Sequence, residues 1–123
     1  MNNIVITGIG RSLVDYLYPD IDFGSPVFKK YESKFIDDGG ISPGRLVFTH
    51  EFEQLTKKRF SNILSELTGG KEPDSINIGG HDIVSLIHAS QILAYEHAEV
   101  KFFGFYGNDE AANYLLESLK KHS

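Results

Sequence analysis

The chain has 123 residues, no cysteine and a formal net charge of −5 at pH 7. This length fits one domain with a core of its own, and the absence of cysteine excludes disulfides, thiolate metal sites and thiol nucleophiles. Lysine and arginine are scattered in short groups without a basic stripe, so we expect no nucleic-acid partner.

The first residues and the hydropathy pattern bear on location. Residues 1–8 lack the basic start and the long apolar run of a signal peptide. No stretch approaches the ~20 apolar residues that a transmembrane helix needs. We therefore expect a soluble, cytoplasmic protein without a membrane partner.

The amino-terminal half predicts a strand, a flap and a helix. Asn3-Ile-Val-Ile-Thr-Gly8 is a β-branched run that ends in glycine, which is typical of a first strand. Between about residues 19 and 48, Pro, Gly and Asp alternate with aromatic residues, and we interpret this segment as a projecting flap of short strands. A helix is predicted from about His50 to Leu67, capped by Thr49 and stopped at Gly69.

The carboxyl half alternates strands with helices. The predicted elements are a strand at 74–78, a helix that follows Gly79-Gly80, a strand at 99–105 and a final helix capped by Asn108 or Asp109 and ending at Lys120-Lys121. This alternation favours an α/β fold with crossover units and a parallel sheet covered by helices. Three strong central strands are few for a doubly wound sheet, so we interpret residues 1–123 as one segment of a larger fold.

Two positions are candidates for binding a ligand. Gly79 and Gly80 separate a predicted strand from a predicted helix, where open α/β sheets bind ligands. Without side chains there, a ligand can approach the backbone and the helix N-terminus closely; a plain tight turn is the alternative. Asp15 could accept hydrogen bonds from the vicinal hydroxyls of a sugar, or it could be a solvated or capping carboxylate.

Other chemistries find no matching motif. No Lys-Ser or Lys-Thr follows the glycine pair at the spacing of a phosphate-binding loop, and a Gly-x-Ser-x-Gly elbow is absent. Gly8-Ile-Gly10 resembles the start of a dinucleotide fingerprint, but Leu13 occupies the position of the third glycine. The five histidines do not have the spacing of metal ligands, so we expect no metal site.

Three motifs, in order along nearly the whole chain, resemble one family. Val5-Ile-Thr-Gly-Ile-Gly-Arg-Ser-Leu-Val-Asp15 is similar to the opening strand and substrate aspartate of the ribokinase-like sugar and nucleoside kinases, the PfkB family. Asn77-Ile-Gly-Gly80 resembles the di-glycine motif of that family. Phe103-Gly-Phe-Tyr-Gly-Asn-Asp109-Glu looks like the strand–turn–helix ending of the same signature. The segment 19–48 stands where these kinases insert a lid over the substrate.

The resemblance implies a three-layer α/β sandwich with a small β-strand lid. It also implies transfer of the ATP γ-phosphoryl group, helped by Mg²⁺, to a hydroxyl of a sugar or nucleoside. Asp15 would hold substrate hydroxyls, Gly79 and Gly80 would lie against the substrate, and the lid would exclude water. His81 and Asp82 replace the Asn with which many members continue the di-glycine motif, and they would supply different polar contacts at the helix N-terminus.

The chain also departs from the family pattern. The general base of these kinases lies in a Gly-Ala-Gly-Asp motif, and neither that motif nor the anion hole and nucleotide site that accompany it are present in this sequence. We therefore expect an amino-terminal portion with no catalytic residue, with ATP and Mg²⁺ bound elsewhere, and with no activity alone. Leu13 stands where ribokinases usually carry Asn, which argues against a ribokinase-type substrate preference. The alternative is a non-catalytic module that forms a homodimer through its flap or an exposed sheet edge.

Overall fold

The structure, a computed structural model, describes residues 3–121. The chain divides into two compact units. Unit 1 comprises residues 1–17 and 75–123, and unit 2 comprises residues 18–74. Because unit 1 is built from both ends of the chain, unit 2 is an insertion within it.

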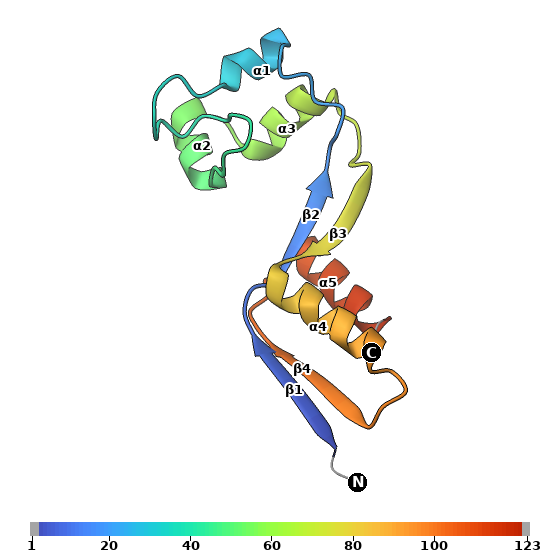
Figure 1. Cartoon of the computed structure of the whole chain (residues 1–123). Helices are drawn as coiled ribbons and strands as arrows, with labels where there is room; N and C mark the ends of the chain where they lie inside the picture. Colours follow the sequence, from blue (N-terminus) through green and yellow to red (C-terminus); the bar gives the residue numbers. More distant parts are fainter. Residues whose placement is uncertain (1–2, 122–123) are drawn as a thin grey trace. The chain divides into compact units, whose positions relative to one another are not determined.

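Unit 1 contains two small sheets and two helices within the part of the chain that the structure describes. Its elements are β1 (Ile4–Ile9), β2 (Leu13–Leu17), β3 (Ser75–Gly79), α4 (His81–Ile92), β4 (Ala98–Phe103) and α5 (Glu110–Lys120), as Figure 1 shows. β1 pairs with β4 in parallel, and β2 pairs with β3 in antiparallel orientation. Unit 2 is inserted between the two paired strands β2 and β3.

The β1–β4 sheet is covered on one face only. Ile6, Val100 and Phe102 are partly buried on the face against which α4 packs, and a Cβ at Gly8 would meet the side chain of Leu86. On the opposite face Ile9 is 80% exposed, alongside other exposed members of the same alternating pattern. The β-branched composition of β1 suits a strand, but its open face and edges leave this sheet incomplete in the described residues.

The two helices of unit 1 supply its buried apolar residues. Ile83 of α4 and Ala112 and Leu115 of α5 are each less than 7% exposed. α5 begins at the predicted cap, because the Asp109 carboxylate accepts a hydrogen bond of 2.9 Å from the Ala112 N–H. The Tyr114 hydroxyl donates to the carbonyl of Ile76 at 2.7 Å, which ties α5 to β3.

Unit 2 is helical, with α1 (Pro26–Tyr31), α2 (Thr49–Thr56) and α3 (Phe60–Thr68). Its core is the cluster of Tyr31, Phe52 and Ile63, each no more than 3% exposed. The rings of Tyr31 and Phe52 meet edge to face with centroids 5.9 Å apart, a favoured aromatic geometry.

The predicted flap of short strands at 19–48 is wrong in its secondary structure. Residues 19–48 contain the helix α1 and one isolated bridge between Glu32 and Ile41, while the antiparallel strand pair lies outside this range at 13–17 and 75–79. The Ser25 hydroxyl accepts a hydrogen bond from the Phe28 N–H, and Pro26 occupies the first helical turn, so this segment begins a helix.

A compact loop follows α1 in place of strands. The Asp38 carboxylate accepts hydrogen bonds from the backbone N–H groups of Lys34, Phe35 and Gly40. These bonds close the loop and hold the pKa of Asp38 well below its usual range, with the Gly40 bond the largest cause. The turn residues of this segment therefore organise a loop through side-chain hydrogen bonds and do not separate strands.

The helix predicted from His50 to Leu67 is two helices. Lys57 has φ 55°, in the left-handed region, and its N–H donates to the Glu53 carbonyl, which ends α2. The Glu53 side chain then accepts a hydrogen bond of 2.7 Å from the Phe60 N–H at the start of α3. Thr49 is the first residue of α2 and does not cap it, whereas the predicted stop at Gly69 is confirmed by its left-handed φ of 66°.

The α/β class is confirmed in its general form, and the sheet arrangement differs from the prediction. β1 and β4 are parallel as expected, but β3 leaves that sheet and pairs with β2, a strand that we did not predict. Among residues 3–121 no helix has the length and apolarity needed to cross a bilayer.

Candidate functional site

The turn between β1 and β2 meets the junction between β3 and α4. Gly80 has φ 98°, and a Cβ at this position would lie 2.5 Å from the carbonyl oxygen of Arg11. Only glycine combines this backbone conformation with so close an approach. The predicted glycine turn therefore brings the beginning of α4 against the chain that follows β1.

Asp15 and Gly79, both predicted as substrate-binding residues, lie together. Asp15 is inside β2, and its carboxylate occupies the space that a Cβ on Gly79 would need. Within residues 3–121, no hydrogen bond or ion pair of this carboxylate is present, and Asp15 is exposed. It is a charged acceptor open to a ligand.

Asn77 belongs to the same face and was missed as a site residue. It is the direct cross-strand partner of Asp15, and its amide donates to the Ser75 hydroxyl at 3.3 Å. Alternation by two from Gly79 places Asn77 and Ser75 on one face of β3. The two-residue alternation could be read from the sequence. It identifies Asn77 as a site residue only together with the pairing of β2 and β3.

The other two predicted site residues, His81 and Asp82, have different surroundings. Asp82, in the first turn of α4, accepts a hydrogen bond of 3.3 Å from the Arg11 N–H, and its carboxylate lies where a Cβ on Gly10 would stand. This contact gives Asp82 a structural role in fastening the β1–β2 turn to α4. His81 is the first residue of α4 and is exposed, and within the described chain its side chain contacts none of the other predicted site residues through a hydrogen bond.

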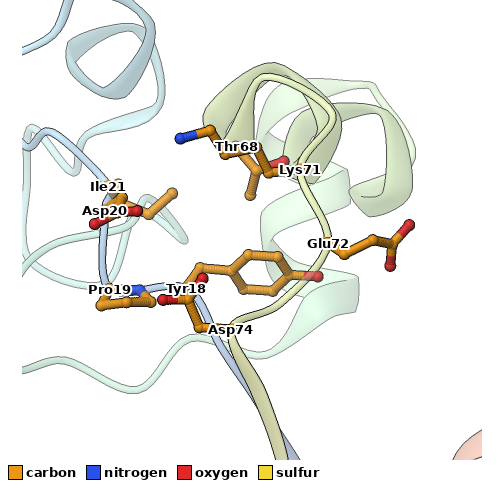
Figure 2. Close-up of a pocket in the computed structure, with 8 residues that line it drawn as sticks. All are labelled: Tyr18, Pro19, Asp20, Ile21, Thr68, Lys71, Glu72 and Asp74. Carbon is orange, nitrogen blue, oxygen red and sulfur yellow. The ribbon is translucent and has the colours of Figure 1, made fainter.

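Figure 2 shows the residues that line a small hollow in unit 2, whose volume is too small for a sugar. It has a volume of about 30 Å³ and is lined by Tyr18, Pro19, Asp20, Ile21, Thr68, Lys71, Glu72 and Asp74. A cavity of this size holds about one water molecule.

A larger hollow of about 300 Å³ in unit 2 is bordered by a charged cluster. Glu66 accepts hydrogen bonds from the Tyr31 hydroxyl at 2.6 Å and from the Lys58 ammonium at 2.9 Å. These bonds lower the pKa of Glu66 to about 2, and the Glu66 bond raises the pKa of Lys58 above its usual range. The Glu66 carboxylate pairs with both Lys58 and Lys30 beside the buried Tyr31, so we assign the cluster to the stability of unit 2.

Clusters of potential metal ligands were sought in the part of the chain that the structure describes. Within residues 3–121, no group of three or more His, Asp or Glu side chains could hold an ion. Comparison with protein-family models, with curated proteins and with solved structures gives no match to the chain.

Proposed function

We propose that this chain binds a small polyhydroxylated ligand, a sugar or a nucleoside, on the β2–β3 face at Asp15. The observation that carries the proposal is the exposed Asp15 carboxylate, which lies across Gly79 without a protein partner in the described residues. A carboxylate in this state can accept hydrogen bonds from two neighbouring hydroxyl groups, and charge makes such bonds stronger than neutral ones.

The neighbouring groups suit the same ligand. Asn77 stands opposite Asp15 on the paired strand, and an amide can both donate to and accept from hydroxyl groups. Gly79 lets the Asp15 carboxylate lie across β3, because any larger residue would occupy its position. Asp15 and Asn77 therefore present acceptors and donors side by side, as recognition of vicinal hydroxyls requires.

The resemblance to the PfkB kinases gives this binding a wider setting, which we include in the proposal. The β2–β3 face would be the substrate side of a cytoplasmic carbohydrate or nucleoside kinase with a ribokinase-like fold. Phosphoryl transfer needs a positioned donor, a metal and a base, and we assign none of these roles to residues of this chain. The chain alone is expected to bind the acceptor substrate without phosphorylating it.

Ligand-dependent thermal stability tests the proposal. The chain would be heated with D-ribose, D-fructose, adenosine or ATP–Mg²⁺, since a ligand that binds only the folded state stabilises it by about 2.7 kcal/mol at a hundredfold excess over Kd. We expect a higher Tm with a sugar or the nucleoside and no change with ATP–Mg²⁺. A shift with ATP–Mg²⁺ alone would contradict the assignment of this chain to the substrate side.

Two matched variants connect the shift to the site. Asp15→Asn keeps the size of the side chain and removes its charge, and it should abolish the ligand-dependent shift while leaving the Tm of the free protein within a few degrees. Asp20→Asn makes the same change at an exposed residue of unit 2 and should leave the shift intact. A full shift in Asp15→Asn would show that the ligand binds elsewhere.

A further inference from the structure

We propose that the outer edge of β4 is a dimer interface, at which β4 pairs antiparallel with β4 of a second copy about a two-fold axis at Val100. This inference is independent of ligand binding at Asp15, because it rests on the other sheet of unit 1.

Within residues 3–121, no strand pairs with the outer edge of β4 in the β1–β4 sheet. Two strands make a poor parallel sheet, since such sheets usually have more strands and are covered on both faces. The carbonyls of His97 and Phe103 accept hydrogen bonds from the N–H groups of Ile4 and Gly10, so alternate residues of β4 direct their backbone groups toward β1.

The other alternate residues of β4 direct their backbone groups away from β1. Because backbone groups alternate along a strand, those of Val100 and Phe102 point to the outer edge of β4, and no partner for them is present in residues 3–121. Unpaired edges of this kind are templates for strand addition. Val100 and Phe102 also line an apolar groove of about 180 Å³ with residues of α4 and α5, so a second copy would add apolar contact there.

The charged side chains of β4 favour a second β4 as its partner and determine the register of the pairing. With Val100 opposite Val100 of the second copy, Glu99 faces Lys101 of the second copy, and the two-fold axis makes this pair twice. Cross-strand pairs of opposite charge stabilise a sheet and like charges destabilise it. This pair occupies a non-hydrogen-bonded position, where side chains approach each other most closely.

The neighbouring registers are opposed by the same residues. Shifting the axis by one residue toward the N-terminus places Glu99 opposite Glu99, and shifting it by one toward the C-terminus places Lys101 opposite Lys101. β4 is therefore complementary to itself in one antiparallel register. The other edge of this sheet, along Ile4–Ile9, carries no charge that could select a register.

Charge exchange tests the interface. By analytical ultracentrifugation of the full chain, we expect a concentration-dependent monomer–dimer equilibrium. Glu99→Lys places lysine opposite Lys101, and Lys101→Glu places glutamate opposite Glu99, so each variant should dimerise about tenfold or more weakly. An equimolar mixture of the two variants should recover the dimer, because opposite charges then face each other across the axis.

The mixture distinguishes loss of the contact between two copies from loss of an ion pair within one chain. Glu99 and Lys101 also form an ion pair of 3.3 Å within β4, and both variants lose it, but mixing cannot restore it. Glu72→Lys and Lys71→Glu make the same changes in net charge in unit 2 and should dimerise like the wild type. A wild-type chain that stays monomeric at its highest soluble concentration, a mixture that stays monomeric, or open-ended larger species would each overturn the proposal.

Discussion

The substitution Gly80→Ala should destabilise unit 1 by straining the turn that begins α4. An alanine at φ 98° is outside the regions open to L-residues, which costs on the order of 1–3 kcal/mol. Its Cβ would also lie 2.5 Å from the Arg11 carbonyl oxygen. That oxygen is part of the backbone and cannot rotate away, so the turn after β1 must move and disturb the hydrogen bond between Arg11 and Asp82.

The magnitude can be measured by urea unfolding followed by far-ultraviolet circular dichroism. With a slope of about 1–3 kcal/mol per M, a loss of about 2 kcal/mol lowers the midpoint by roughly 1 M. Gly79→Ala is the matched control, because its φ is not positive and the atoms nearest to its new Cβ belong to the side-chain carboxylate of Asp15. It should change stability by less than about 1 kcal/mol and yet abolish ligand binding by displacing Asp15. Equal midpoints for Gly80→Ala and the wild type would refute this account of the turn.

Two further predictions concern unit 2. Ile63→Ala removes a fully buried side chain from the Tyr31–Phe52 cluster and should cost about 2–5 kcal/mol in the free energy of unfolding, measured by urea unfolding; an unchanged midpoint would contradict the assigned core. Because folding lowers the pKa of Glu66 from 4.5 to about 2, its contribution to stability is complete above about pH 4.5 and is lost as the pH falls through about 2. Thermal unfolding across this range should show a smaller acid-induced fall in Tm for Glu66→Gln than for the wild type, and parallel curves would contradict the role of the cluster.

The elements that the sequence predicts well are those with strong local signals. β1 is a β-branched run, and α5 has a capping aspartate before its amphipathic face. Gly69 ends α3 as predicted, because a left-handed residue at a helix end favours glycine. In each case the physical cause lies within a few residues, so the pattern alone determines the structure.

The errors arise where a distant or side-chain contact decides the outcome. The strand at 13–17 is short, and it is defined by its pairing with β3. Residues 18–74 separate the two strands in the sequence. The helix breaks at Lys57, although the apolar pattern of the sequence continues past this residue. The Glu53 side chain can accept the hydrogen bond from the Phe60 N–H only because the chain turns between the two helices. Local propensity cannot show either contact.

The candidate site was predicted in part. The resemblance selected Asp15 and Gly79 separately, and the structure brings the two into contact. Asn77 was overlooked as a site residue because its place opposite Asp15 depends on the register of β2 with β3. Asp82 was expected to contact the ligand, and its hydrogen bond to Arg11 shows that it also supports the turn.

Chemical-shift mapping would locate the bound ligand on the protein residue by residue. Backbone ¹H–¹⁵N spectra of the labelled chain would be recorded during titration with the sugar or nucleoside that raises its Tm. We expect saturable shifts centred on Asp15, Asn77, Gly79 and Gly80, which disappear in Asp15→Asn. Shifts confined to residues 18–74, or shifts at the β2–β3 face that persist unchanged in Asp15→Asn, would contradict this expectation.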